Sequence, residues 1–356
     1  MRACFFSTAP LEQLEREQYS IADIRILREL GFEVTIANRY ANIPGNCDLY
    51  FSWWASGSIF PLIKASLRRR PIIVVAGGNE AVRYRDSASG QALGYLNAPL
   101  HKRIATRLVL RLCTVLTVVS RFMVPHVVAL SGGREPLLVP LCVDTERFVS
   151  GDAAREFVTT ICRLDEEPAR VKRVETFIRA IPFVLQRHPG QRFLVIGFHG
   201  DAYARLRALA AGLGVEGVLE FVGAIRNEEV VRYLQRSKCY VQVSDTETFG
   251  LAVAEAMSSE TPVVVSRAGA LSELTRGVGV VVDQNSPHAV AEGLCQLLAM
   301  DEGSRGELGR QCRAVVLDRY SYEARRNSIA DIVRKLGLQP GAAAHGRPLP
   351  PEGGQG

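Results

Sequence analysis

Residues 245–273 read DTETFGLAVAEAMSSETPVVVSRAGALSE, and this segment carries the strongest functional signal in the chain. A turn at 249–251 precedes an apolar helical stretch, and the β-branched run 262–265 predicts a buried strand. Glu247 lies in the loop and Glu255 lies two turns into the helix. Glycine lets backbone approach a ligand, and a helix amino terminus presents free N–H groups. The segment therefore predicts a site for a sugar attached to a phosphate.

The same alternation of short apolar runs and amphipathic stretches extends in both directions. Continuous apolar strands alternating with helices predict parallel sheets that are covered on both faces. The expected strands are 3–6, 33–37, 48–51, 71–75, 115–119, 137–141, 157–162, 193–196, 218–222, 240–243, 262–265 and 278–282. The clearest helices are 19–30, 57–69, 99–112, 121–130, 287–300, 303–318 and 322–336.

A chain of 356 residues exceeds what one hydrophobic core usually serves, so two Rossmann-like domains are expected. We assign 1–150 to an N-terminal domain, 151–320 to a C-terminal domain and 321–338 to a closing helix. The tail 339–356 is expected to be disordered, and the Gly-, Asn- and Ser-rich segment 76–98 to be a long loop that is either functional or mobile. Two doubly wound domains in tandem place a cleft between the carboxyl ends of their strands.

Composition and motifs exclude several classes of protein. No apolar run approaches the roughly 20 residues that cross a bilayer, and the N-terminus is too short in apolar residues for a secretory signal, so a cytoplasmic chain is expected. Eight scattered cysteines without a C-x-x-C pair predict reduced, buried thiols, and the six histidines lack metal-ligand spacing. The absence of G-x-G-x-x-G after the first strand and of G-x-x-x-x-G-K-[ST] disfavours nicotinamide enzymes and P-loop ATPases.

The net charge of +6 comes from the first half, because residues 1–150 hold 18 Lys/Arg against 12 Asp/Glu and the remainder holds 25 of each. Helix 100–112 carries four of these basic residues beside Ile104, Leu108 and Leu112. Two interpretations stay open: peripheral contact with an anionic membrane and its lipid-linked acceptor, or an ordinary solvated helix face. The basic residues concerned are Arg68, Arg69, Arg70, Arg83, Arg85, Lys102, Arg103, Arg107 and Arg111.

Four elements in order resemble the retaining glycosyltransferases of the GT-B fold that share a Glu-x7-Glu motif (glycosyltransferase group 1, family 4). They are the stretch 139–148 (VPLCVDTERF), Arg163 followed by Lys172, the run 221–229, and the segment from Glu247 to Glu273. The resemblance covers most of residues 138–300. It implies an α/β protein with two Rossmann-like doubly wound domains facing an interdomain cleft, in which 1–150 would be the acceptor-side domain and 151–320 the nucleotide-sugar-binding domain.

The resemblance also implies roles for individual residues. Glu247 corresponds to the residue that contacts donor-sugar hydroxyls, and Glu255 to the one that accepts both ribose hydroxyls. Arg163 and Lys172 would hold the departing diphosphate without a metal ion, since fixed cations there stabilise the transition state. Arg170 and Arg173 remain alternatives to Lys172. The turn and the helix start would add backbone N–H groups, from Phe249, Gly250, Leu251 and Ala252. The backbone of Ile225 and Arg226, after strand 218–222, would hold the nucleobase.

The sequence departs from the family in its first half. The loop 7–11 (STAPL) lacks the usual glycines, and the usual histidine after the fourth strand is absent. Gly77 and Gly78 stand there instead and would admit the donor sugar, and Asn79 or Glu80 would bind its hydroxyls. For Glu80 the alternative is a plain loop carboxylate. Glu273 either resembles a family glutamate or caps a turn.

The expected function is metal-independent, retaining transfer of a hexose from a nucleoside-diphosphate sugar to an acceptor hydroxyl. The donor is a UDP- or GDP-sugar, no cofactor is expected, and the acceptor is a carbohydrate or a lipid-linked molecule in polysaccharide or glycolipid assembly. No nucleic-acid partner is expected. The alternatives are a non-catalytic, glycosyltransferase-like binding protein and a GT-B sugar-nucleotide epimerase.

Overall fold

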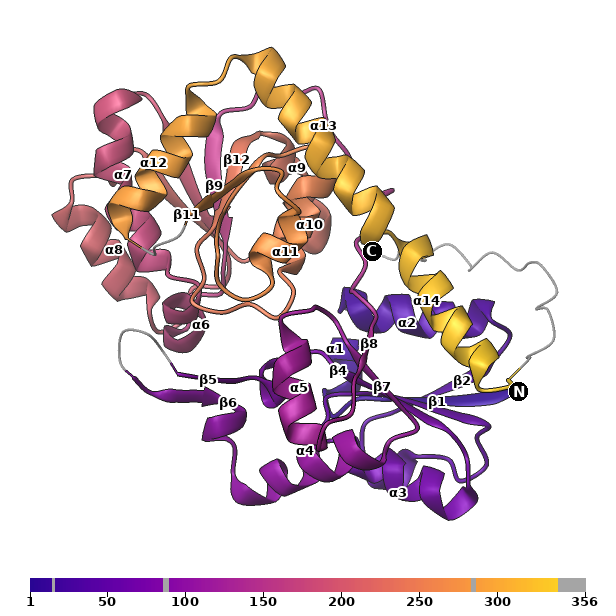
Figure 1. Ribbon diagram of the computed structural model, residues 1–356. Helices are drawn as coiled ribbons and strands as arrows, with labels where there is room; N and C mark the ends of the chain where they lie inside the picture. Colours follow the sequence, from indigo (N-terminus) through magenta and orange to yellow (C-terminus); the bar gives the residue numbers. More distant parts are fainter. Residues whose placement is uncertain (15–16, 86–89, 283–285, 339–356) are drawn as a thin grey trace, which may run out of the picture.

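A computed structural model describes residues 1–14, 17–85, 90–282 and 286–338, and it contains two six-stranded parallel sheets (Figure 1). The first sheet has the order β2-β1-β3-β4-β7-β8. Its strands are β1 (Arg2–Phe6), β2 (Glu33–Ala37), β3 (Leu49–Trp53), β4 (Ile72–Ala76), β7 (Val115–Val118) and β8 (Leu137–Leu138).

The second sheet has the order β11-β10-β9-β12-β13-β14. Its strands are β9 (Phe157–Ile161), β10 (Arg192–Ile196), β11 (Leu219–Gly223), β12 (Ser237–Gln242), β13 (Val263–Ser266) and β14 (Val280–Val282). In both sheets the strand order reverses next to the first strand, and the crevice at such a point is where doubly wound folds bind ligands. The predicted strands are confirmed to within a few residues at their ends.

Helices cover both sheets. Those of the first half are α1 (Leu11–Leu14), α2 (Gln18–Glu29), α3 (Ile59–Arg68), α4 (Leu100–Leu112) and α5 (Met123–Ser131). The second half has α6 (Glu166–Val171), α7 (Val174–Arg187), α8 (Tyr203–Gly212), α9 (Asn227–Gln235), α10 (Leu251–Ser258), α11 (Leu271–Thr275), α12 (Pro287–Leu298), α13 (Glu302–Arg319) and α14 (Tyr322–Lys335).

Local sequence explains where these elements begin and end. Strands β3 and β4 are buried along their whole length, as expected for apolar runs in a sheet covered on both faces. Ser286, Asp301 and Ser321 each accept a backbone N–H in the first turn of the helix that follows, which satisfies a donor that the helix itself leaves free. All eight cysteines are free and buried, as the sequence predicted.

The described parts of the segment 76–98 contain regular elements in place of the expected loop. They include an antiparallel hairpin of β5 (Arg83–Arg85) and β6 (Ala92–Gly94), flanked by two short 3-10 turns. Alternation in such short strands gives too weak a signal to detect in sequence. The tail 339–356, for which disorder was predicted, lies outside the described residues. No helix in the described ranges is long and apolar enough to cross a bilayer.

Helix α14 returns from the second half of the chain and packs against α2 of the first (Figure 1). Arg325 of α14 forms an ion pair with Asp23 of α2 at 2.6 and 2.8 Å, and both side chains are almost completely buried. Arg325 also donates to the carbonyl oxygens of Val139 and Pro140, and Asp23 accepts the indole N–H of Trp53 at 2.8 Å. These bonds fasten helix α14 to the first half of the molecule.

Candidate functional site

The loop between β12 and α10 holds Glu247 in a fixed position. Its Oε2 accepts a hydrogen bond from Nε2 of Gln242 at 2.8 Å, and its Oε1 accepts the backbone N–H of Thr248 at 3.2 Å. The backbone of Gly269 lies directly against Glu247, where a Cβ would come within 2.2 Å of the Glu247 carbonyl oxygen. Ala270 donates its N–H to that same oxygen at 2.8 Å. The carboxylate is therefore oriented before any ligand arrives.

Helix α10 presents its amino terminus beside this carboxylate. Gly250 has a φ of 98°, which favours glycine, and a Cβ there would lie 2.7 Å from a methyl group of Leu271. The N–H groups of Val253 and Ala254 both donate to the Gly250 carbonyl, so the earlier N–H groups, from Gly250 to Ala252, point out of the helix. Such a terminus favours an anion.

Phe249 has a packing role in this structure. Its side chain is 4% exposed and meets the ring of Tyr320 edge to face at 5.5 Å. It anchors the turn to the core, and any contact with a ligand is left to its backbone. Leu251 and Ala252, in the first turn of α10, are partly exposed.

The ammonium group of Lys172 lies at the carboxyl end of β9, near enough to Glu255 for the two charges to interact. Its Nζ donates to the carbonyl oxygen of Ile161 at 3.4 Å. Burial raises the pKa of Glu255 to about 7, while the charges of Arg147 and Lys172 act in the opposite direction. The Glu255 carboxyl of α10 is therefore within the electrostatic influence of two cations.

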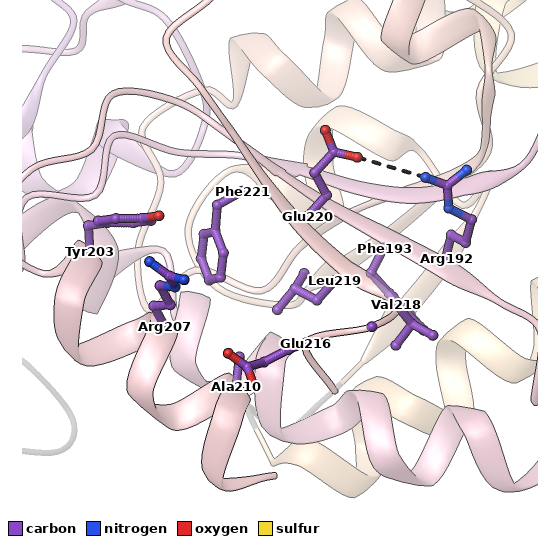
Figure 2. A pocket seen from close by; sticks show the side chains of 11 residues that line it. Arg192, Phe193, Tyr203, Arg207, Ala210, Glu216, Val218, Leu219, Glu220 and Phe221 are labelled. Carbon is purple, nitrogen blue, oxygen red and sulfur yellow. Dashed lines mark ion pairs between the residues drawn. The ribbon is translucent and has the colours of Figure 1, made fainter. Parts of the chain in front are cut away.

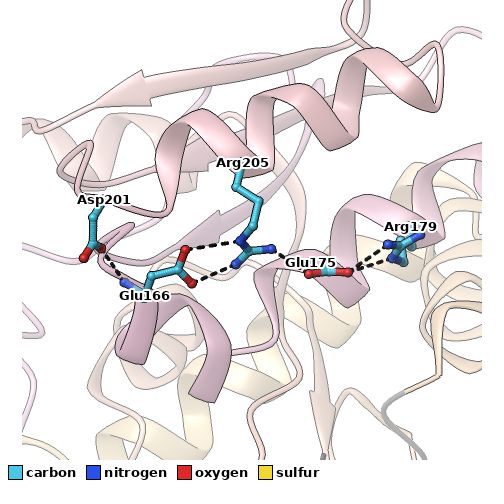
Figure 3. Close-up of polar contacts among 5 residues, drawn as sticks. All are labelled: Glu166, Glu175, Arg179, Asp201 and Arg205. Atoms are coloured by element: carbon cyan, nitrogen blue, oxygen red, sulfur yellow. Dashed lines mark hydrogen bonds and ion pairs between the residues drawn. The ribbon is translucent and has the colours of Figure 1, made fainter.

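A chain of ion pairs on the surface supports the helix that leads into Lys172 (Figure 3). Arg205 of α8 contacts Glu166 of α6 at 3.0 Å and Glu175 of α7 at 2.7 Å, and Asp201 accepts the N–H of Glu166 at 2.7 Å. Exposed ion pairs contribute little individually, but this set ties three helices together. The N–H of Asp245 also donates to the carbonyl of Val171 at 2.8 Å, which joins the Lys172 loop to the Glu247 loop.

The other basic candidates differ in their surroundings. Arg163 follows β9, is mostly exposed, and pairs with Asp165 at 2.9 Å. Arg173 has a φ of 55° and pairs with Asp245 at 2.6 Å, with both side chains largely buried. Arg170 also has interaction partners. Of the three neighbours considered for the phosphate, Lys172 is the one whose charge acts on Glu255.

The two residues predicted to hold a nucleobase follow β11. Ile225 packs against the apolar group of Phe157, Leu194 and Ile196. The N–H of Arg226 donates to Glu229 at 3.0 Å and its carbonyl accepts the N–H of Glu229 at 2.9 Å, so both its backbone groups serve the first turn of α9. The N–H of Arg226 is therefore already used within the protein, whereas its carbonyl oxygen retains a second lone pair.

Gly77, Gly78 and Glu80 follow β4, in the first half of the chain. A Cβ at Gly77 would lie 2.4 Å from the ring of Trp53, and one at Gly78 would lie 2.4 Å from the ring of Trp54. Both glycines are thus required by aromatic packing, whether or not a sugar approaches them. Glu80 accepts the N–H of Ala55 at 3.3 Å, and burial raises its pKa to about 7.

Glu273 joins the two halves of the molecule. Its carboxylate accepts the N–H groups of Arg121 at 2.9 Å and Phe122 at 3.2 Å, immediately before α5. It therefore caps a helix of the first half, whereas the sequence offered a family role or the capping of its own turn. Nothing local in the sequence predicts a contact across 152 positions.

Three residues of the site were not assigned roles from sequence: Gln242, Arg147 and Gly269. Gln242 is a buried polar residue in the otherwise apolar run 240–243. A polar residue in a buried strand needs a hydrogen-bond partner, so the sequence could have pointed to Gln242 as a site residue. Arg147 lies in the recognised stretch 139–148, but only the fold brings it toward Glu255. The role of Gly269 depends on a φ of 62° and on the neighbouring loop.

A separate pocket lies along edge strand β11 of the second sheet (Figure 2). Tyr203 and Arg207 of α8 face Phe221 of that strand, and Arg192 pairs with Glu220 at 3.8 Å. None of the predicted site residues lines it. Across the described ranges, no group of three or more His, Cys, Asp or Glu side chains is arranged to hold a metal ion.

Comparison with known proteins shows which family the second half of the chain resembles. Residues 152–314 match the family described as glycosyl transferases group 1. The chain is 32% identical over 154 residues to an uncharacterized glycosyltransferase of Methanocaldococcus jannaschii, covering 43% of this chain and 39% of the relative. It is 33% identical over 202 residues to a D-inositol 3-phosphate glycosyltransferase of Acidothermus cellulolyticus, covering 50% and 44%. Both matches thus span less than half of the relative.

Solved structures extend the likeness to both halves. HepE of Anabaena, solved in complex with UDP and glucose, is 16% identical with a TM-score of 0.74, over 94% of this chain and 99% of that one. Sucrose-phosphate synthase of Thermosynechococcus elongatus is 18% identical with a TM-score of 0.68, over 92% and 80%. At these identities the likeness shows the fold, which is GT-B as predicted. The chain therefore has a GT-B fold, and residues 152–314 are similar to the glycosyl transferases group 1 family.

Proposed function

We propose that this protein is a retaining glycosyltransferase that moves a hexose from a nucleoside-diphosphate sugar to an acceptor hydroxyl without a metal ion. The observation that carries the proposal is the convergence of Lys172, Glu255 and the amino terminus of α10 at the carboxyl ends of β9 and β12. Cations and free N–H groups fit a diphosphate, and an adjacent carboxylate fits a ribose diol.

The chemistry follows from where charge develops. As the bond between the anomeric carbon and the diphosphate breaks, negative charge grows on the departing phosphate oxygens. Lys172, the α10 N–H groups and a reoriented Arg163 would stabilise that charge more in the transition state than in the ground state. Arg163 is exposed, and its guanidinium pairs with the surface carboxylate of Asp165, so it can swing toward a phosphate.

Glu247 would orient the donor sugar through its hydroxyls. Its bonds from Gln242 and Thr248 leave lone pairs available, because a carboxylate accepts about four hydrogen bonds. UDP-glucose is the first donor to test, since a structural neighbour of this fold was solved with UDP and glucose. Assembly of a polysaccharide or glycolipid is the process we propose for the reaction.

The test compares wild type with Lys172→Ala and Glu247→Gln, with Lys335→Ala and Glu302→Gln as exposed controls. Release of UDP is followed with a panel of acceptor sugars in the presence of a chelator. Each site variant should lose roughly 10²–10³-fold in kcat, as for removal of one transition-state donor, and the controls should match wild type. NMR of the product should show the anomeric configuration of the donor.

Three outcomes would contradict the proposal in distinguishable ways. Full activity in a folded Lys172→Ala variant would remove the assigned phosphate site. Tight binding of UDP by wild type without turnover for any acceptor would indicate a binding protein. Release of UDP without an acceptor, together with inversion at a sugar carbon, would indicate an epimerase.

A further inference from the structure

We propose that the outer face of helices α3 and α4 docks on a membrane surface rich in anionic phospholipid. The two helices contact each other below the first sheet (Figure 1). Each already buries one side in the protein, through Pro61, Leu62 and Ala65 of α3 and Thr106, Val109 and Leu110 of α4. The docking face is the opposite side of both helices.

The docking face is apolar. On α4, Leu100, Ile104, Leu108 and Leu112 recur every four residues, so they form a stripe along one side of the helix. Leu100 is 70% exposed and Leu112 is 65% exposed. On α3, Phe60, Ile63 and Leu67 form a second exposed stripe, in which Leu67 is 74% exposed.

This concentration of apolar side chains is unusual for a free surface. Sixteen large hydrophobic side chains are exposed among the described residues, and seven of them belong to these two helices. Exposed apolar residues scattered singly need no explanation, but a contiguous group marks a contact surface. The structure therefore favours a docking role over the ordinary surface helix, which was the alternative that the sequence left open.

The charge around the stripes selects the partner. Residues 59–70 and 99–114 contain eight basic residues and no Asp or Glu: Lys64, Arg68, Arg69, Arg70, Lys102, Arg103, Arg107 and Arg111. Arg70 has a carboxylate within ion-pair distance, Asp48 at 3.7 Å. Apolar stripes flanked by basic residues match the boundary between acyl chains and anionic headgroups. A symmetric contact with a second copy would instead bring like charges together.

The test is flotation of the full chain with vesicles, in the absence of sugar nucleotide. Vesicles of phosphatidylcholine are compared with vesicles containing phosphatidylglycerol at 30 mol% (about 0.3 mole fraction) and low salt. The protein should float with the anionic vesicles, and each basic residue removed should lower partitioning roughly five-fold. The variants are Ile104→Ser with Leu108→Ser, and Lys102→Glu with Arg111→Glu. The matched controls, Leu317→Ser and Arg319→Glu, change exposed residues of α13.

The two α4 variants should lose vesicle binding, and the α13 controls should keep it. Sedimentation velocity and circular dichroism check that each variant is folded and report its oligomeric state. Wild-type protein that fails to bind anionic vesicles, or α4 variants that bind as well as wild type, would overturn the proposal. A wild-type dimer that becomes monomeric in Ile104→Ser with Leu108→Ser would assign the face to a second copy. Because no sugar is transferred, these results are independent of the proposed function.

Discussion

Replacing Arg325 by methionine tests the connection between α14 and the first sheet. The substitution leaves the carboxylate of Asp23 buried without its cation, and Arg325 and Asp23 are 1% and 0% exposed. Removing one partner of a buried pair costs about 3–5 kcal/mol. The bond from the Trp53 indole to Asp23 persists and offsets part of this cost, so we expect about 3 kcal/mol.

The measurement is urea unfolding followed by tryptophan fluorescence. Both tryptophans of the chain, Trp53 and Trp54, lie at the end of β3, so the signal reports on the half of the molecule that contains Asp23. The matched control is Arg326→Met, which breaks the pair with Glu29 at 3.2 Å between the same two helices. That pair is more than one third exposed, so its loss should cost about 0–1 kcal/mol.

A double variant distinguishes the loss of the ion pair itself from the cost of leaving one buried charge without its partner. Asp23→Leu with Arg325→Met removes both charges and should recover much of the lost stability, since apolar replacement of a buried pair is often neutral. The reasoning is refuted if Arg325→Met unfolds at the same urea concentration as Arg326→Met. It is also refuted if the double variant is less stable than Arg325→Met.

Three further predictions concern the candidate site. Because burial raises the pKa of Glu255 to about 7, its carboxyl stabilises the free protein below about pH 4.5 and loses this contribution as the pH rises to about 7. A ribose diol needs the ionised form, so affinity for UDP-glucose should rise about ten-fold from pH 6 to pH 8, and titration calorimetry of Glu255→Gln should show a flat profile. Gly269→Ala pushes a methyl group into the Glu247 backbone and should lower kcat more than ten-fold (roughly 1.4 kcal/mol), whereas Gly277→Ala, also at positive φ but with open space, should leave kcat unchanged. Glu273→Ala removes the cap of α5 and should lower thermal stability by about 1 kcal/mol; an unchanged midpoint in calorimetry would contradict that capping role.

The sequence predicted most of the fold because apolar periodicity is a local property. The expected strand 33–37 coincides with β2, and helix 322–336 matches α14 to within one residue. The β5–β6 hairpin was missed, since three-residue strands provide too few positions for a period to show. The location of Glu247 beside a helix start was also local, because loop, glycine and helix follow one another directly in the chain.

What sequence alone determined is the set of elements and the chemical types at their ends, since both depend on neighbours within a few residues. Tertiary structure decided which of those groups meet. Lys172 approaches Glu255 across 83 positions only because β9 and β12 are adjacent in the sheet. Glu273 caps α5, and Arg325 reaches Asp23, for the same kind of reason. Burial in the folded protein also decided the raised carboxyl pKa. In an unfolded chain water solvates the carboxylate and keeps its pKa at the ordinary value, and only the tertiary structure removes that water.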